Sequence, residues 1–314
     1  MLLLLIEVLR ALLLSIFYYI PICAKLLLPK YFKKSVKNET VLITGGASGF
    51  GKSLAKKFLS LGSNVIIVDV NKSAGNATVS EFHEYLNTLS EAERGFIKFY
   101  HADLTKKEAV YSVFSLIQDN DGDVDILINN AGVVSGSSLL DTPDERIQLT
   151  FDVNILAHFW TIKALLPTMI QKRKGHIVNV ASMAGVVGTN NMVDYCSSKF
   201  AAVGLHEALR EELLAQQNDF VECTLVCPYY ANTGMFAGVK TDVLPLLEAE
   251  DVTESILHAV LLEMDTTCIP SYQMFLPLLK FLMPTTVYSN FCQRIGISHS
   301  MDQFRGRSNG IKKD

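Results

Sequence analysis

The chain has 314 residues, of which 49% are apolar and 19% are charged, and its formal net charge is −4 with a pI near 6.0. This length and apolar content suffice for one sizeable core, so a single catalytic domain is expected. The acidic balance provides no broad basic surface, which excludes nucleic acid as an expected partner.

Residues 1–28 form a hydrophobic segment that predicts a membrane anchor, either spanning or monotopic. The uncharged run 11–24 is shorter than the roughly 20 residues that cross a bilayer as a helix, and Pro21 interrupts it. If a helix begins at residue 1, Glu7 and Arg10 share one face and partly neutralise each other, which lengthens the usable apolar segment. A cleaved signal peptide fits less well, because this region carries Glu7 in place of a basic cluster.

A basic linker is expected at residues 29–37. Five lysines precede the first acidic residue after the anchor, Glu39: Lys25, Lys30, Lys33, Lys34 and Lys37. The positive-inside rule therefore places the following domain in the cytoplasm. The six cysteines show no framework of close pairs, which agrees with a reducing compartment, and no Cys/His cluster has metal-ligand spacing, so no metal is expected.

From residue 40 the sequence alternates short apolar runs with longer amphipathic ones, which is typical of a parallel sheet with helices on both faces. Strands are predicted at 41–43, 64–68, 96–101, 126–129, 176–181 and 221–227, and long helices at 143–170 and 192–215. The expected fold class is α/β, a single doubly wound Rossmann-type parallel sheet at 38–265, preceded by the N-terminal anchor helix.

A glycine-rich turn at residues 44–51, Thr-Gly-Gly-Ala-Ser-Gly-Phe-Gly, follows the first predicted strand and opens a helix. Glycines there permit close approach of the backbone to a pyrophosphate, which the helix N-terminus favours. The second strand ends in Asp69, whose carboxylate can accept the ribose 2′-OH of adenosine. A 2′-phosphate would repel Asp69, so NAD is the expected cofactor, with Lys72 the one nearby cation that softens the preference.

Tyr195 and Lys199 lie four residues apart in a predicted helix and therefore on one face. A tyrosine has an ordinary pKa of about 10, and a nearby ammonium favours its phenolate, so the pair is interpreted as a tunable acid/base. The same spacing also fits a solvated helix face. The presence of Asn154 and Ser182 upstream, together with the glycine turn, favours the catalytic interpretation.

In their order and spacing, these motifs resemble the short-chain dehydrogenase/reductases over about residues 38–240. The matching features are the turn at 44–51, Asn-Asn-Ala-Gly at 129–132, Asn154, Ser182, Tyr195-x-x-x-Lys199 and Pro228. The chain looks most like a membrane-anchored subgroup, the epidermal-type retinol dehydrogenases and lipid-droplet 17β-hydroxysteroid dehydrogenases. The stretches 233–236 and 301–307 favour the retinol side. Tyr229, where many members have glycine, suggests an altered pocket shape.

The resemblance implies that Tyr195, as phenolate, removes the alcohol proton while hydride passes to the nicotinamide. It implies that Lys199 lowers the Tyr195 pKa and binds the nicotinamide ribose. Ser182 would bind the substrate oxygen, and Asn154 would hold a water that links Lys199 to solvent. Further cofactor contacts are expected at Gly45, Ser48, Gly49, Phe50, Gly51, Asp69, Asp103, Leu104, Asn130, Ala131, Gly132, Pro228 and Thr233. For Asp103 the alternative is a helix N-cap. Substrate contacts are expected at Tyr229, Tyr230, Met235 and Phe236.

Residues 266–314 are expected to form an apolar C-terminal extension. Between Asp265 and Arg294 the only charged residue is Lys280, and three prolines break the run. Two interpretations remain open: a buried final helix, or an apolar lid or membrane-dipping element beside the substrate.

The expected reaction is NAD-dependent interconversion of a lipophilic alcohol and its carbonyl, with all-trans-retinol to retinaldehyde favoured. The alternatives are a 17β-hydroxysteroid dehydrogenase and a non-catalytic scaffold, both on lipid droplets. A scaffold has no need for all four of the residues Asn154, Ser182, Tyr195 and Lys199. The resemblance also implies a homodimer, and a location on the endoplasmic reticulum membrane, lipid droplets or both, with the catalytic domain facing the cytoplasm.

Overall fold

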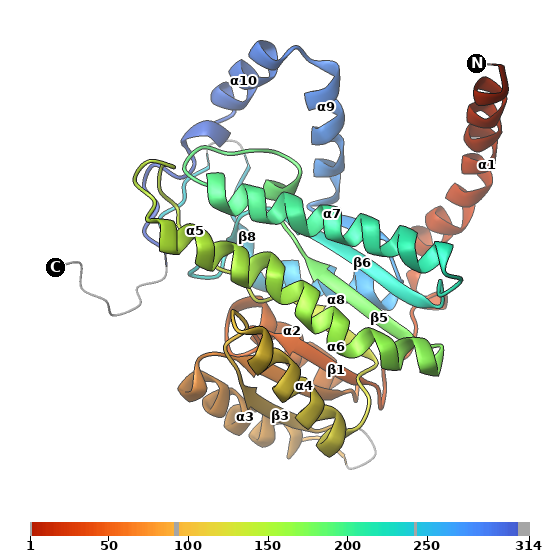
Figure 1. The fold of residues 1–314 in the computed structure, drawn as a ribbon, viewed down its shortest axis with the longest axis vertical. Helices are drawn as coiled ribbons and strands as arrows, with labels where there is room; N and C mark the ends of the chain where they lie inside the picture. The colour runs from red at the N-terminus through yellow and green to blue at the C-terminus, as the bar shows by residue number, and fades with distance from the viewer. Residues whose placement is uncertain (1, 91–93, 242–243, 307–314) are drawn as a thin grey trace.

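The computed structural model describes residues 2–90, 94–241 and 244–306. Seven parallel strands form one sheet in the order β3-β2-β1-β4-β5-β6-β9 (Figure 1). The strands are β1 Thr40–Thr44, β2 Asn64–Asp69, β3 Ile97–His101, β4 Ile126–Asn129, β5 Gly175–Val180, β6 Val221–Pro228 and β9 Thr266–Ile269. Because β1 pairs with both β2 and β4, the winding reverses there, and the predicted doubly wound fold is confirmed.

Helices cover both faces of this sheet. The helices on one face are α2 Gly49–Ser60, α3 Lys72–Leu86 and α8 Ala249–Leu261, which pack through Phe58, Phe82 and Ile256. The helices on the other face are α4 Lys107–Asp121, α6 Ala157–Lys172 and α7 Val193–Ala215, which pack through Phe114, Leu165 and Leu213. The central strands β1 and β4 are buried along their whole length, which explains their continuous apolar sequence.

The structure differs from the sequence prediction in three features. The long helix predicted at 143–170 is two helices, α5 Asp144–Phe151 and α6, joined by the π-helical turn η3 Asp152–Leu156. The catalytic sheet was predicted to end before residue 266, but β9 pairs with β6 beyond that boundary. This strand lies at the sheet edge with Thr266 exposed, so it lacks the apolar pattern of a strand buried on both faces. A two-stranded sheet, β7 Ala231–Asn232 with β8 Leu247–Glu248, was also not predicted.

The N-terminal segment is one helix, α1 Leu2–Leu27, which continues through Pro21 where an interruption was expected. Its stretch Leu4–Lys25 is long and apolar enough to cross a bilayer and is entirely unburied. The only other such stretch among the described residues, Asp144–Lys172, is 44% buried within the domain. Arg10 Nη1 lies 3.9 Å from Glu7 Oε1, so the two charges share one helix face as predicted. Near the base of α1, Lys25 Nζ donates a hydrogen bond to the Leu262 carbonyl at 2.8 Å.

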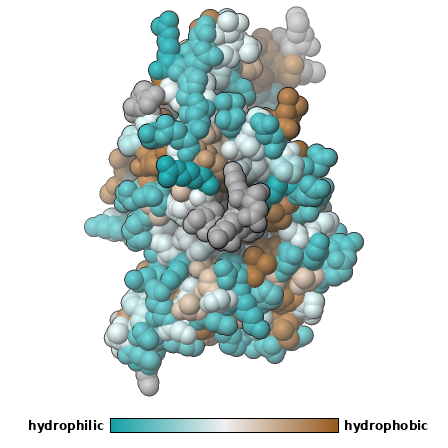
Figure 2. All heavy atoms as spheres, turned by 90° about the vertical axis from the view of Figure 1, so that its left-hand side faces the viewer, coloured by the Kyte–Doolittle hydropathy of each residue, from teal (hydrophilic) through white to brown (hydrophobic). Residues whose placement is uncertain are grey.

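The C-terminal extension leaves the sheet after β9 and rises away from it (Figure 1). It contains the short helix η5 Ser271–Phe275, then α9 Leu276–Leu282, α10 Thr285–Arg294 and the single turn η6 Ile297–His299. None of the α9 residues, all of which the structure describes, is buried. The interpretation as a buried helix is therefore wrong for α9, whereas α10, the last α-helix, buries Cys292. Figure 2 shows that the neighbouring face of the molecule, at the left of Figure 1, is mainly hydrophilic with scattered apolar residues.

Candidate active site

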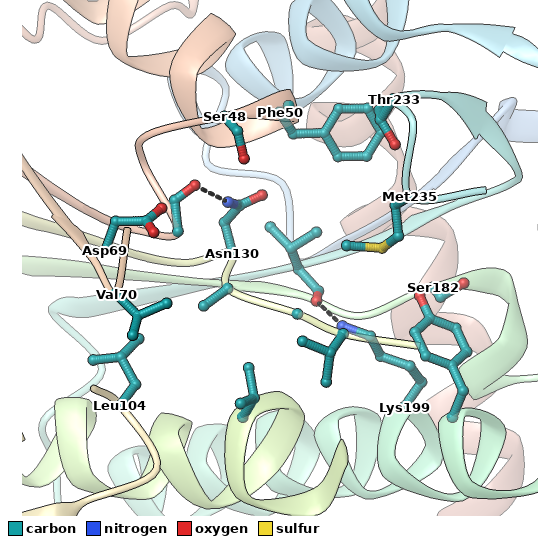
Figure 3. Close-up of a pocket in the computed structure, with 18 of the residues that line it drawn as sticks. Ser48, Phe50, Asp69, Val70, Leu104, Asn130, Ser182, Lys199, Thr233 and Met235 are labelled. Carbon is teal, nitrogen blue, oxygen red and sulfur yellow. Dashed lines mark hydrogen bonds between the residues drawn. The ribbon is translucent and has the colours of Figure 1, made fainter. Parts of the chain in front are cut away.

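The site is a cavity of about 410 Å³ at the carboxyl ends of the strands (Figure 3). Its wall is built from the turn after β1, the ends of β2 and β6, and the segments that follow β3, β4 and β5. In a doubly wound sheet this edge, where the winding reverses, is the position at which ligands bind. Asp69 lies at one end of the close-up, and Ser182 and Lys199 lie at the other.

The glycine turn forms the part of the wall next to the N-terminus of α2. Gly45 has φ +65°, and a Cβ there would lie 2.9 Å from Ala131 Cα, so only glycine fits. Ser48 precedes α2 without a side-chain capping bond among the described residues, and it lines the cavity with Gly49 and Phe50. Gly51 does not line the cavity. A Cβ on Gly51 would lie 2.2 Å from the Gly45 carbonyl oxygen, so its requirement is close packing within the turn.

Asp69 is the last residue of β2, and backbone amides hold its carboxylate in place. Oδ2 accepts a hydrogen bond from Ala47 N at 3.0 Å, and Oδ1 accepts one from Asn71 N at 2.9 Å. These two bonds fix the position of the carboxylate. Asp69 therefore presents its carboxylate at the end of the cavity nearest β2.

The segments after β3 and β4 supply the next part of the wall. Asp103 and Leu104 line the cavity, and Asp103 Oδ1 accepts bonds from Thr105 N and Oγ1. The N-cap of α4 is Lys106, so the alternative role of Asp103 as a helix cap is wrong. Asn130 Nδ2 donates to the Thr44 carbonyl at 2.9 Å, which ties the end of β4 to the end of β1. Ala131 and Gly132 continue the wall.

Ser182, Tyr195 and Lys199 converge at the other end of the cavity. Tyr195 and Lys199 are 4% and 3% exposed, so the pair is not on a solvated helix face. Lys199 Nζ lies 5.7 Å from the centre of the Tyr195 ring and donates to the Val180 carbonyl at 2.8 Å. Ser182 Oγ donates to the Pro228 carbonyl at 3.3 Å and accepts from Ala184 N at 3.1 Å.

Burial controls the ionisation of the Tyr195 and Lys199 pair. It raises the pKa of the Tyr195 phenol above its ordinary value, and the hydrogen bond with Ser182 opposes this only in part. Burial lowers the pKa of Lys199 to about 8. Burial therefore outweighs any lowering of the Tyr195 pKa by Lys199, and the lowering effect of Lys199 stays a prediction. Full burial shifts a pKa by up to roughly 3–5 units, whereas a nearby charge shifts it by roughly 1–3.

Asn154 lies in the π-helical turn η3, fully buried behind the cavity wall. Its Oδ1 accepts from Val133 N at 2.8 Å, and its Nδ2 donates to the Val133 carbonyl at 2.9 Å and to Ser198 Oγ at 3.0 Å. A Cβ on Gly132 would lie 3.5 Å from Asn154 Oδ1 and 3.9 Å from Lys199 Nζ. Asn154 therefore fixes the segment that passes directly over Lys199.

A second cavity of about 40 Å³ adjoins the first, and Ser182, Tyr195 and Phe236 line both. The predicted substrate contacts divide between them, because Tyr229 and Tyr230 line only the second and Met235 lines only the first. The aromatic rings pack edge to face, with centroids 5.1 Å apart for Tyr230 and Phe236 and 5.9 Å for Tyr195 and Phe236. Pro228 and Thr233 complete the nearby wall of the first cavity.

The wall of the second cavity also contains residues that the sequence did not reveal. Leu276 and Ile297 line it from the C-terminal extension. Nearby, Tyr230 Oη and Ser300 Oγ are hydrogen-bonded at 3.1 Å, and Met301 is only 2% exposed. Residues 301–307 entered the sequence analysis only through their resemblance to the retinol dehydrogenases. Nothing in the local sequence predicts that residues 301–304 pack beside this cavity. Residue 307 lies outside the described residues.

The residues of the first cavity fit a dinucleotide. The glycine turn and the N-terminus of α2 offer backbone N–H groups to a pyrophosphate, and Asp69 offers a carboxylate to ribose hydroxyls. At the opposite end, Lys199 and Tyr195 provide donors next to the position where a nicotinamide would be held. The polar groups at the two ends of the cavity thus match the adenosine half and the nicotinamide half of a dinucleotide, with the adenosine half beside β2 as expected from the fold.

Comparisons with known proteins agree with this geometry. The model of the short chain dehydrogenase family matches residues 39–244. Human epidermal retinol dehydrogenase 2 is 41% identical over 281 residues, covering 88% of each chain. Human estradiol 17-beta-dehydrogenase 11 is 40% identical over 273 residues, covering 87% of this chain and 88% of the relative. A Burkholderia phymatum short chain dehydrogenase/reductase, solved in complex with NAD, has a TM-score of 0.70 at 24% identity, covering 79% of this chain and 94% of its own.

Proposed function

The chain belongs to the short-chain dehydrogenase family, and on that premise we propose that it is an NAD-dependent oxidoreductase of lipophilic alcohols, converting all-trans-retinol to retinaldehyde. The observation that carries the proposal is the placement of Ser182, Tyr195 and Lys199 where the dinucleotide cavity meets the second cavity. A substrate hydroxyl there reaches both the acid/base pair and the cofactor.

The residues that would hold NAD are those that line the first cavity. The backbone of the turn at Gly45–Gly49 would hold the pyrophosphate, Asp69 would accept hydrogen bonds from the adenosine ribose hydroxyls, and Lys199 would donate to the nicotinamide ribose. Asp69 disfavours a 2′-phosphate by like-charge repulsion of roughly 1–4 kcal/mol at about 4 Å. A nicotinamide held there would supply the acceptor for the hydride of the alcohol carbon.

The protein groups handle the proton. Ser182 Oγ orients the substrate oxygen, and Tyr195, as phenolate, takes the hydroxyl proton as the carbonyl forms. Lys199 is held by the Val180 carbonyl, which keeps its ammonium beside the Tyr195 ring. Asn154 acts as a positioning residue, because its bonds to Val133 fix the loop over Lys199. The water-holding role implied for Asn154 remains part of the proposal.

The N-terminal helix α1 is proposed as the membrane anchor, and the basic linker favours a catalytic domain that faces the cytoplasm. The proposed location is the endoplasmic reticulum membrane, lipid droplets or both, and the proposed assembly is a homodimer. A 17β-hydroxysteroid substrate is the second candidate, supported by the 40% identity to estradiol 17-beta-dehydrogenase 11.

The test is an assay of membranes from cells that express the full chain. All-trans-retinol and estradiol are each supplied with NAD or NADP, and reduced cofactor is measured. Retinol with NAD should give the highest kcat/KM. A clear preference for estradiol would select the steroid candidate, and no turnover of either alcohol would support the scaffold alternative.

A further inference from the structure

The segment around α9 presents apolar side chains to solvent. Seven large apolar residues between 272 and 287 are at least half exposed: Tyr272, Met274, Phe275, Leu278, Phe281, Leu282 and Val287. Phe281 is 87% exposed. Monomeric soluble domains rarely leave so many apolar side chains uncovered along one segment, so this surface requires a partner.

The charges of this segment indicate which partner. From residue 266 to residue 301 the sequence has no Asp or Glu, and its charged residues are Lys280 and Arg294. Lys280 is exposed within the apolar run, with Nζ 5.3 Å from the centre of the Phe200 ring. An apolar segment whose charged residues are both cations complements an anionic lipid surface, where acyl chains lie beneath negatively charged headgroups.

The placement of α1 supports the same partner. Figure 1 shows the free end of α1 and the pair α9–α10 projecting beyond the same end of the domain, far from β3. The apolar stretch of α1 is wholly unburied, as expected of a helix whose surroundings are lipid. A bilayer that holds α1 therefore lies on the side of the domain from which α9 projects.

The second cavity connects this surface to the catalytic residues. Leu276, the first residue of α9, lines that cavity together with Ser182 and Tyr195. The cavity volume of about 40 Å³ is near the roughly 30 Å³ that one water occupies in the liquid. A drug-sized ligand needs a pocket of roughly 300–1,000 Å³, so part of the wall must move to admit a lipid-sized alcohol. Since α9 has no buried residue, it is the wall element with the least packing to lose.

We propose that α9 is a lipid-inserted gate: its exposed apolar side chains contact the acyl layer of an anionic bilayer, and its displacement opens the second cavity to substrate from that layer. The contact with lipid is inferred from exposure, charge and the placement of α1, and not from the proposed function. The passage of substrate rests on the proposed function, so the two parts are tested separately.

The lipid contact is tested in the full chain with tryptophan as the probe. The single native tryptophan is removed with Trp160→Phe, and either Phe281→Trp or Leu140→Trp is added. Leu140, on the loop after β4, is 96% exposed and serves as the matched control. In vesicles of phosphatidylcholine and phosphatidylserine, acyl-chain bromination should quench Phe281→Trp and leave Leu140→Trp unchanged. Equal, weak quenching at both positions would overturn the lipid contact, and fluorescence of Phe281→Trp that changes only with protein concentration would assign the surface to a second copy.

The gate is tested by kinetics of Phe281→Asp with Leu140→Asp as control. For all-trans-retinol in vesicles, kcat/KM should fall by about tenfold or more in Phe281→Asp only, since an apolar contact is lost. For 3-methyl-2-buten-1-ol, a water-soluble allylic alcohol, kcat/KM should stay unchanged. Equal losses with both alcohols would overturn the gate. Failure of the unmutated chain to oxidise either alcohol would refute the proposed function, while the quenching result would stand.

Discussion

Lys199 Nζ lies 5.7 Å from the centre of the Tyr195 ring, yet its hydrogen bond goes to the Val180 carbonyl. The strand end, and not the phenol, therefore fixes the position of the ammonium. Burial raises the pKa of Tyr195 and lowers that of Lys199 to about 8. The phenol of Tyr195 therefore keeps its proton at neutral pH. This favours carbonyl reduction at low pH and alcohol oxidation at high pH.

The pH dependence of activity should follow from that pair. Oxidation needs the phenolate, so its kcat/KM should rise between about pH 6 and about pH 9, and reduction should change in the opposite sense. Steady-state rates in both directions across this range provide the measurement. An oxidation optimum below neutrality would show that a group other than Tyr195 is the base.

Asp69→Ala should change cofactor choice. Removing the carboxylate eliminates the repulsion of a 2′-phosphate and also the acceptor for the ribose hydroxyl, so the NADP-to-NAD ratio of kcat/KM should rise by about tenfold or more. Asp103→Ala is the matched control, since it removes another cavity carboxylate and should leave the ratio nearly unchanged. A wild-type preference for NADP would contradict the assignment of NAD.

Acid should destabilise the fold through His158. This side chain is 1% exposed, and among the described residues neither ring nitrogen has a hydrogen-bond partner. Burial lowers its pKa to about 3 from an ordinary 6.5. Below pH 6.5 the unfolded chain binds the proton that the folded chain excludes. The free energy of unfolding should therefore fall as the pH decreases below 6.5, and His158 should contribute about 1.4 kcal/mol per pH unit to this fall. Above pH 6.5 the contribution of His158 should not change with pH.

Urea unfolding in detergent at several pH values measures this slope. In His158→Leu the slope between about pH 6 and about pH 4 should become shallower. Equal slopes in His158→Leu and the wild type would show that His158 does not control the acid response.

Deletion of residues 1–28 should preserve the fold of the catalytic domain. It removes the apolar α1 and the Lys25 bond to Leu262 but none of the cavity-lining residues. The shortened chain should keep NAD affinity and bind membranes more weakly, with residual binding through α9. Sedimentation after a salt wash measures the binding, and loss of NAD affinity would show that α1 is needed for folding. Protease protection of the domain in intact microsomes would instead place it in the lumen.

The sequence predicted six of the seven main-sheet strands, and five of these are buried along most of their length, which favours apolar residues. The edge strand β3 was predicted although it is only partly buried, whereas the four-residue edge strand β9, with Thr266 exposed, was missed. Most residues of the first cavity wall were predicted from motifs at strand ends, whereas Leu149 and Val153, from α5 and η3, were not predicted. Gly51 proved to be a packing residue. The direction of the Tyr195 pKa depends on burial, which spacing does not report. The pairing of Tyr230 with Ser300, seventy positions apart, has no local signal.

The most direct test of the central claim is NADH formation by Tyr195→Phe with all-trans-retinol, measured beside NAD binding. Phenylalanine keeps the ring that packs on Phe236 and removes only the hydroxyl that exchanges the proton. We predict that NAD binding is retained while turnover falls by at least about a hundredfold relative to the wild type. Turnover retained in Tyr195→Phe would contradict the assignment of Tyr195 as the base.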